Sequence, residues 1–318
     1  MLFGSQIFIL NGIPRFYEVP ISSGLFFSIT GINFVLLAFF NEKTNFKNIF
    51  IGCLCLALSV ACRPTYIFSS LIIIPFILKR FIENLKNKKD IVKNVLVVAI
   101  PYLTVGILLM YYNYIRFGSF FEFGAKYQLT VNDMLHLSNR FATIWTGLIC
   151  SLFSIPNFIP NFPFISNHNN LITFYGYYYI ENMVGGLFIL VPICFWIFKF
   201  PFILKKINNK ELIVFITMLI FDGFLICILS VIMGGSMQRY IVDYGWMFVL
   251  AGICIIIEHI NIFKSNEAKD IIKKLFAFLT IYIVIINLCS GIVSEKSFMK
   301  NNSPEQFYRI KYMVNFWE

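Results

Sequence analysis

Residues 111–130, YYNYIRFGSFFEFGAKYQLT, place hydrogen-bonding side chains among aromatic rings directly after a long apolar run. Arginine offers a phosphate two coplanar donors, and aromatic rings stack on the faces of sugars, so this segment could hold a phosphosugar. The alternative is an interface anchor, in which the rings lie at the level of the lipid headgroups and Glu122 pairs with Lys126. The candidate substrate-binding residues are Asn113, Arg116, Glu122, Lys126 and Gln128.

A second segment, SMQRYIVDYGW at residues 236–246, combines an arginine, an aspartate and aromatic rings behind two glycines. Arg239 with Tyr240 could bind a lipid phosphate next to this glycine-containing loop. Arg239 and Asp243 are four residues apart, however, and an ordinary ion pair on one helix face would explain the same spacing. All three residues are candidates for substrate binding.

Isolated charges beside or inside apolar runs are further candidates. Arg63 has so little loop around it that it must find an acid, a carbonyl oxygen or a ligand. Asp222 lies in the middle of an apolar run, where it would either relay protons or ions or pack as a protonated acid. Glu18 is the first acid of the chain and could act as a general base, although solvated carboxylates are the commoner outcome. The same holds for Asp133 and Glu181.

The composition indicates a membrane protein, surrounded by lipid. Of the 318 residues, 58% are hydrophobic and 13% charged, and the mean hydropathy is +0.77. This balance requires a bilayer as solvent. The net charge of +10 does not predict a nucleic-acid partner, because the basic residues cluster between apolar runs, as in the loops of membrane proteins. The eight cysteines lie mostly inside apolar runs, so neither a metal site nor a disulfide framework is expected.

Apolar runs of about 20 residues predict membrane-crossing helices. Residues 49–79 are also apolar but are split by Arg63-Pro64. Because proline lacks an N–H and disfavours helix in the preceding residue, this stretch predicts a tight pair of short helices turning at residues 61–65. The fold class is therefore all-α, a polytopic bundle of about eight membrane segments, two of them short, in one membrane domain over residues 1–318. The six longer helices are predicted at roughly 20–41, 94–115, 183–200, 212–232, 244–262 and 275–293.

The distribution of lysine and arginine predicts the orientation in the cell membrane. Four groups of loops and helix ends carry 16 of the 26 basic residues and should be cytoplasmic. Residues 116–182 and 294–318 then face the extracytoplasmic side. Within the first of these segments, residues 139–154 predict a helix, and the proline- and asparagine-rich residues 156–170 predict irregular backbone at the interface.

The first ten residues are apolar but too short to cross a bilayer, and they lack the features of a signal peptide. We interpret them as the end of a helix whose beginning is absent. The chain is then expected to be the carboxy-terminal part of a longer protein, without its amino-terminal helix and loop.

Five segments together resemble a known family of membrane enzymes. They are ACRPT (61–65), YNYIRFGSFFEFGAKYQLT (112–130), NFPFI (161–165), ENMVGGLFILVP (181–192) and RYIVDYGW (239–246). The resemblance covers most of residues 18–260 and is to bacterial polytopic glycosyltransferases of the GT-C type, in particular the protein-mannosyltransferase-like and aminoarabinose-transferase-like members. It implies a multi-helix enzyme that transfers a sugar from a polyprenyl-phosphate carrier, the lipid-linked donor, to an acceptor at the extracytoplasmic face.

The resemblance also implies roles for individual residues. Arg239 and Tyr240 match an Arg-Tyr pair near a late helix of the family and would bind the carrier phosphate. The outer cavity would be lined by Arg63, Arg116, Glu122 and Lys126.

The sequence departs from the family at the catalytic acid, which is typically an Asp-Asp or Asp-Glu pair after the first membrane helix. The first aspartate here is Asp90, which is predicted to be cytoplasmic, and no acidic pair precedes the helix at residue 20. The catalytic residue is therefore unknown, with Glu18 as the candidate, and the chain would be a truncated or an inactive member. No cofactor is predicted, and a requirement for a divalent cation is left open.

Two other functions remain open. A transporter or flippase of lipid-linked glycans would need charged groups at membrane depth, for which Asp222 is the candidate. A non-catalytic membrane partner in envelope polysaccharide assembly would explain the missing acidic pair.

Overall fold

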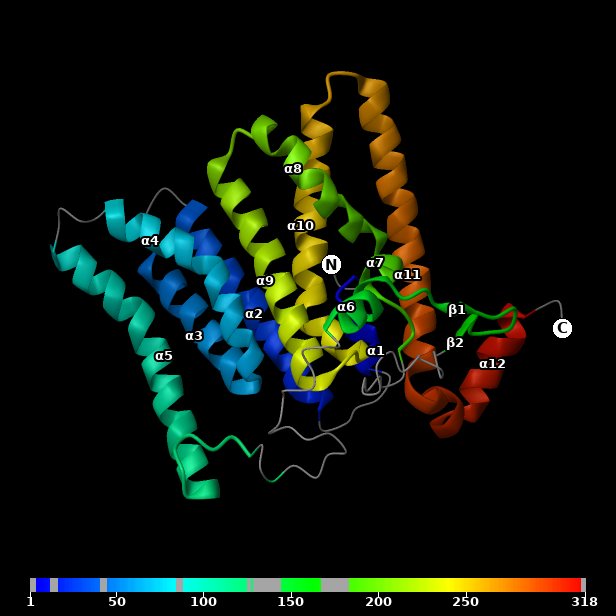
Figure 1. Ribbon diagram of the computed structural model, residues 1–318, viewed down its shortest axis with the longest axis horizontal. Coiled ribbons are helices and arrows are strands. Elements are labelled where there is room, and N and C mark those ends of the chain that lie inside the picture. The colour runs from blue at the N-terminus through cyan, green and yellow to red at the C-terminus, as the bar shows by residue number, and fades with distance from the viewer. Residues whose placement is uncertain are drawn as a thin grey trace. The chain divides into compact units, whose positions relative to one another are not determined.

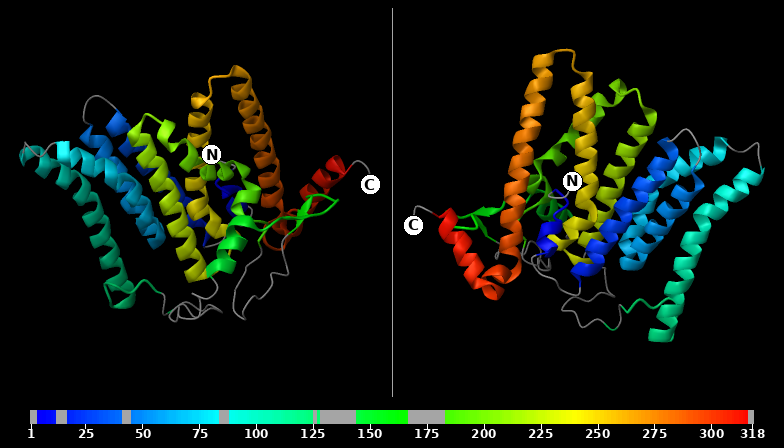
Figure 2. Two further views of the ribbon diagram at one scale, coloured as in Figure 1. Left: turned by 45° about the horizontal axis from the view of Figure 1, so that its top comes forward. Right: turned by 180° about the vertical axis from the view of Figure 1, so that it is seen from behind.

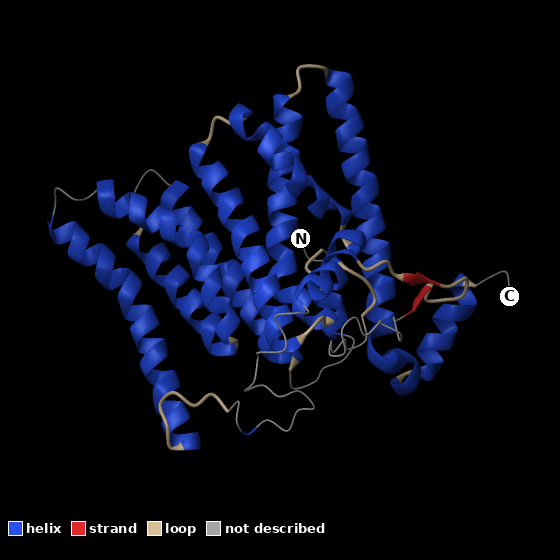
Figure 3. Ribbon diagram, viewed as in Figure 1, coloured by secondary structure: helices blue, strands red, loops and turns tan. Residues whose placement is uncertain are grey.

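The computed structural model describes residues 4–11, 17–40, 45–83, 88–124, 127, 144–166 and 183–315. These residues form an all-α protein apart from one two-stranded antiparallel ladder (Figure 1, Figure 3). Among them, six helices are long and apolar enough to cross a membrane, and two shorter apolar helices accompany them. The chain is thus a multi-pass membrane protein. Its contacts divide it into unit 1, residues 1–19 and 138–318, and unit 2, residues 20–137.

Unit 2 contains most of α2 (Glu18–Phe40) and the four helical stretches that follow it along the chain. Arg63 is extended, with φ −151°, so the predicted break at Arg63-Pro64 is confirmed, although the second half, Pro64–Glu83, is long enough to cross alone. Small residues let the helices approach, because a Cβ on Gly31 would lie 2.8 Å from the carbonyl oxygen of Gly52. The other elements are α3 (Phe46–Cys62), η1 (Pro64–Ile73), α4 (Ile74–Glu83) and α5 (Lys88–Phe117).

Unit 1 is built around three long helices, of which α10 (Ile241–Ile262) packs against both α9 (Lys210–Gly234) and α11 (Asn266–Asn302) (Figure 2). The side chains of Asn209 and Ser265 cap α9 and α11 by accepting hydrogen bonds from first-turn N–H groups. Most of α10 is buried, so it forms the core of the unit. The shorter elements are α1 (Ile7–Asn11), α6 (Ile144–Phe153), β1 (Asn157–Phe158), β2 (Ile165–Ser166), α7 (Leu187–Leu190), η4 (Pro192–Lys199), α8 (Phe200–Ile203), η5 (Leu204–Lys206), η6 (Gln238–Tyr240) and α12 (Pro304–Val314).

Residues 183–200 do not form the continuous helix that their hydropathy predicts. The chain instead passes through the short helix α7 and the 3₁₀-helix η4, because Pro192 has no N–H to continue the hydrogen bonding of α7. Gly186, just before α7, lies against the backbone of α6, since a Cβ there would be 2.4 Å from the nitrogen of Phe153. The prediction is wrong at this position, whereas the other five predicted helices coincide with long helices of the structure.

Three further segments of unit 1 bear on the sequence predictions. The ladder pairs Phe158 with Ile165, so the prediction of irregular backbone is wrong for part of residues 156–170. Residues 167–170 lie outside the described residues. α6 confirms the described part of the helix predicted at residues 139–154, and α1 packs against α11.

Candidate functional site

The candidate site lies where α9 ends and α10 begins. α9 ends at Gly234, and the following Gly235 has φ +79°, a conformation that glycine adopts without steric cost. The ring of Tyr240 lies so close to Gly234 that a Cβ there would be 2.2 Å from Tyr240 Cε2. These two glycines let the chain turn into η6, which carries Gln238, Arg239 and Tyr240.

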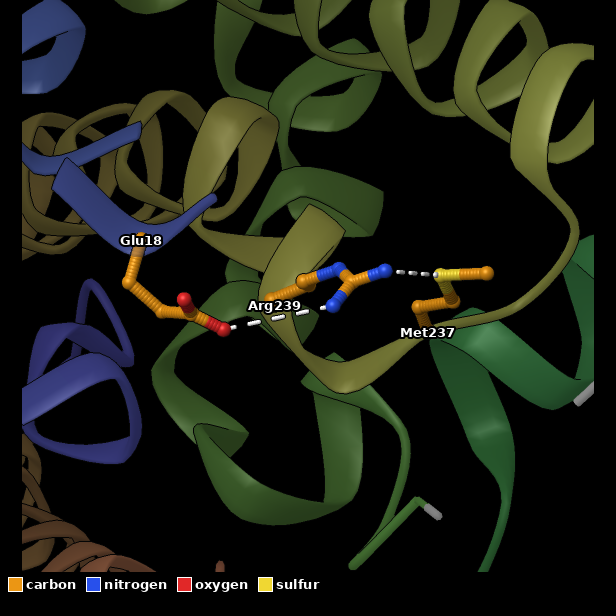
Figure 4. A network of polar contacts seen from close by, with 3 residues as sticks. All are labelled: Glu18, Met237 and Arg239. Carbon is orange, nitrogen blue, oxygen red and sulfur yellow. Dashed lines mark hydrogen bonds and ion pairs between the residues drawn. The ribbon is translucent and has the colours of Figure 1, made fainter. Parts of the chain in front are cut away.

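The Arg239 cluster consists of Arg239 and the four side chains around it, from Tyr17, Glu18, Met237 and Tyr240. Arg239 Nη1 lies 3.9 Å from Glu18 Oε1, and Nη2 donates to the sulfur of Met237 at 3.3 Å (Figure 4). The guanidinium carbon is 5.5 Å from the ring centroid of Tyr17 and 5.6 Å from that of Tyr240, which is within cation–π range. The structure therefore brings the predicted Arg-Tyr pair together with the candidate general base.

Both charges of the Glu18–Arg239 pair are largely removed from solvent. The Glu18 side chain is 11% exposed and the Arg239 side chain 17% exposed. Partial burial of two charges costs desolvation energy, and their pairing and the nearby rings act against this cost. Because a guanidinium carries five N–H donors, Arg239 can bind an anionic ligand beside the carboxylate or in exchange for it.

Asp243 lies in the first turn of α10 and has no exposed surface. Its backbone carbonyl oxygen accepts a hydrogen bond from Trp246 Nε1 at 3.1 Å. Figure 4 shows an ion pair of Arg239 with Glu18, at the start of α2, and the pair of Arg239 with Asp243 stays a prediction. The spacing of Arg239 and Asp243 therefore did not reveal the role of Glu18.

A chain of three buried amide side chains fixes η6. Gln238 Oε1 accepts hydrogen bonds from the backbone N–H groups of Val184 at 3.0 Å and Gly185 at 3.3 Å. Gln238 Nε2 donates to Gln6 Oε1 at 3.3 Å, and Gln6 Nε2 donates to Asn287 Oδ1. This amide chain holds the residue next to Arg239 and was not predicted from the sequence. The available signal was the presence of amides within or beside apolar runs, where each needs a partner.

Two serines attach the loop before η6 to α6. Ser236 has no exposed surface and donates to the carbonyl oxygen of Gly147 at 2.9 Å. The Ser151 hydroxyl lies 2.7 Å from that of Ser236. The position of Arg239 thus depends on segments that are far apart in the sequence.

The Arg116 turn, residues 112–124 at the end of α5, is held by local contacts. Arg116 is exposed, its Nη1 donates to the hydroxyl of Tyr112 at 3.2 Å, and its guanidinium carbon lies 5.0 Å from the ring centroid of Phe117. Glu122 Oε1 accepts a hydrogen bond from the N–H of Gly124 at 2.9 Å. These contacts are typical of the interface anchor.

Of the remaining candidates, the structure describes two in unit 2, Asn113 and Arg63. Asn113 is buried and donates to the carbonyl oxygen of Phe120 at 3.4 Å. Arg63 is half-buried and separates α3 from η1. The outer cavity that Arg63, Arg116, Glu122 and Lys126 are predicted to line stays a prediction. Four candidates lie outside the described residues: Lys126, Gln128, Asp133 and Glu181.

Asp222 lies near the middle of α9 and has no exposed surface. Within the part of the chain that the structure describes, neither of its carboxylate oxygens has a hydrogen-bond partner. An ionised carboxylate in such surroundings is costly, and ionisable groups at membrane depth are commonly functional. The described residues contain no group of three or more His, Cys, Asp or Glu side chains that could hold a metal ion.

Fold and site together define a polytopic helical membrane protein with an arginine-centred polar cluster at one end of unit 1. Comparison with known proteins finds no family model, no curated protein and no solved structure that matches the chain.

Proposed function

We propose that the chain is a GT-C-type membrane glycosyltransferase that moves a sugar from a polyprenyl-phosphate carrier to an extracytoplasmic acceptor. The supporting observation is the Arg239 cluster, in which an arginine, two aromatic rings and an acid meet where α9 and α10 join. The proposal includes the orientation in which this end of unit 1 faces away from the cytoplasm.

In the proposed reaction, a hydroxyl oxygen of the acceptor bonds to the anomeric carbon of the sugar. The bond between that carbon and the carrier phosphate breaks, and the phosphate keeps the electron pair. Arg239 binds the phosphate and stabilises the charge that it gains. Glu18 accepts the proton of the acceptor hydroxyl.

Glu18 and the phosphate compete for the same guanidinium, and this competition can be measured. Glu18→Gln removes the negative charge and keeps the shape, so the variant should bind a polyprenyl phosphate more tightly and lose sugar transfer. Arg239→Gln should weaken binding about 10- to 100-fold, which corresponds to a charge-assisted hydrogen bond of about 1.5 to 3 kcal/mol. Binding is measured with a fluorescent polyprenyl phosphate and the full chain in lipid nanodiscs.

Arg116→Gln is the matched control, because it removes the same charge from a site with local contacts, and it should leave binding unchanged. Wild-type binding by the Arg239→Gln variant would remove the phosphate role. Weaker binding by the Glu18→Gln variant would show that the Glu18–Arg239 pair serves the fold rather than the ligand.

A second candidate function, the transport of a lipid-linked glycan, is favoured by the buried carboxyl group of Asp222. Asp222→Asn should then stop the flipping of a fluorescent lipid-linked glycan in proteoliposomes while the binding of polyprenyl phosphate stays intact. Flipping by the wild-type chain without sugar transfer would favour this function over the transferase.

A further inference from the structure

The short helix α6 has an exposed face that is apolar throughout. Trp145 is 76% exposed, Ile149 60% and Phe153 37%. Because residues four apart align on a helix, these three side chains form one row, which we call the α6 stripe. None of residues 144–166 carries a charged side chain, so the α6 stripe has no charged neighbour along this part of the chain.

The opposite face of α6 fixes the level at which the helix lies. Its Gly147 and Ser151, one helical turn apart, both contact the hydroxyl of Ser236, at 2.9 Å and 2.7 Å. Ser236 lies between two candidate membrane spans, of which one ends at Gly234 and the next begins at Gln238. Hydrogen bonds therefore attach α6 to the point where two membrane spans meet.

The α6 stripe continues into a row of phenylalanine rings. The ring of Phe153 stacks on that of Phe188, with 5.1 Å between centroids, and lies 6.4 Å from that of Phe195. The ring of Phe195 is in turn 6.3 Å from that of Phe198. Phe195 and Phe198 are exposed on η4, which packs against α10 and α11. The exposed apolar surface thus runs from α6 to an element that packs on two membrane spans.

We infer that α6 inserts into one leaflet of the bilayer without crossing it, and that the α6 stripe contacts the acyl chains there. The ten residues of α6 extend about 15 Å, roughly half the thickness of the hydrocarbon layer. A continuous exposed apolar surface marks a site of contact with membrane or protein, and tryptophan is favoured at the boundary between headgroups and acyl chains. The lipid boundary then passes beside η6, and this inference does not depend on the proposed transferase activity.

Photo-crosslinking tests the contact between the α6 stripe and lipid. The photo-crosslinking residue benzoylphenylalanine replaces Ile149 in the full chain, in vesicles of phosphatidylcholine. Because Ile149 is exposed, the melting temperature should stay the same. Illumination should give a phospholipid adduct, detected by mass spectrometry, in a yield similar to that at Phe278, an exposed site within the candidate span of α11. The same residue at Lys264, exposed in the loop between α10 and α11, should give several-fold less adduct.

Fluorescence quenching measures which medium surrounds Trp145. The contribution of Trp145 is the difference in emission between the wild-type chain and Trp145→Phe, which keeps an aromatic ring at this exposed position. Lipids brominated on their acyl chains should quench this contribution several-fold more than iodide dissolved in the water does.

The inference is overturned if iodide quenches Trp145 more than brominated lipid does, or if the adduct yield at position 149 is no higher than at position 264. A crosslink from position 149 to another segment of the chain, or to a second copy, would show that protein covers the α6 stripe and would equally overturn it. None of these outcomes depends on the binding of polyprenyl phosphate, so this inference and the proposed function are tested separately.

Discussion

The Arg239 cluster and the Arg116 turn contain the same kinds of side chain but are held in different ways. In the turn, Arg116 is exposed and contacts Tyr112 and Phe117 of its own helix. In the cluster, Arg239 is 17% exposed and contacts Tyr17 and Glu18 from the beginning of the chain.

We interpret this difference as the one between an interface anchor and a candidate binding site. A side chain held by neighbours on its own helix keeps those contacts wherever the helix lies, so the contacts indicate nothing about a ligand. A side chain contacted from a distant segment, as Arg239 is by Tyr17 and Glu18, has its geometry fixed in advance, which is what binding and catalysis require. The two regions could not be distinguished by composition, and they should respond differently to substitution.

Removal of the amide chain should lower the free energy of unfolding more than any other change considered. Gln238→Leu leaves Gln6 and the N–H groups of Val184 and Gly185 without this partner, at a cost of about 2 to 5 kcal/mol. Asn113→Leu in unit 2 removes one long hydrogen bond of 3.4 Å and should cost about 1 kcal/mol or less. Denaturant unfolding in detergent compares the variants. Equal losses would contradict the view that long-range contacts hold unit 1.

A methyl group at Gly234 should lower the free energy of unfolding by a smaller amount. Gly234→Ala forces the ring of Tyr240 to move, which should cost about 1 to 3 kcal/mol and weaken the binding of polyprenyl phosphate. Gly118 has φ +68° and open space around it, so Gly118→Ala should cost about 1 to 2 kcal/mol through backbone strain alone and leave binding unchanged. Thermal unfolding and ligand titration of both variants test this difference. Unaltered binding by Gly234→Ala would show that the position of Tyr240 does not matter.

The smallest effect is expected in the Arg116 turn. Tyr112→Phe removes the acceptor of one exposed hydrogen bond from Arg116, so stability should change by no more than about 0.5 kcal/mol. Binding of polyprenyl phosphate should stay the same. A clear fall in binding would place the Arg116 turn in the site and end the contrast with the Arg239 cluster.

The long helices could be predicted because a bilayer imposes a length on every apolar crossing. The break at Arg63-Pro64 was also predictable, since proline acts on its immediate neighbours. The break within residues 183–200 was not predicted, because hydropathy does not depend on backbone hydrogen bonding or on packing. Pro192 and the close approach of Gly186 to α6 prevent a continuous helix there.

The candidate site could be predicted only in part. Arg239 and Tyr240 stand out by their types, and Glu18 by being an acid at the start of an apolar run. The contact between Glu18 and Arg239 depends on how the helices pack, which the spacing of residues along the chain does not reveal. The amide chain escaped detection because single amides in apolar runs do not specify which of them will meet.

The contact between Gln6 and Asn287 joins residues 281 positions apart. At the usual speed of translation, the ribosome makes the second of these residues roughly 15 to 60 s after the first. The early helices therefore enter the membrane well before the surroundings of Arg239 can be completed. A nascent chain arrested before residue 287 should insert its early helices normally. It would lack α11, however, and with it the contact between Gln6 and Asn287.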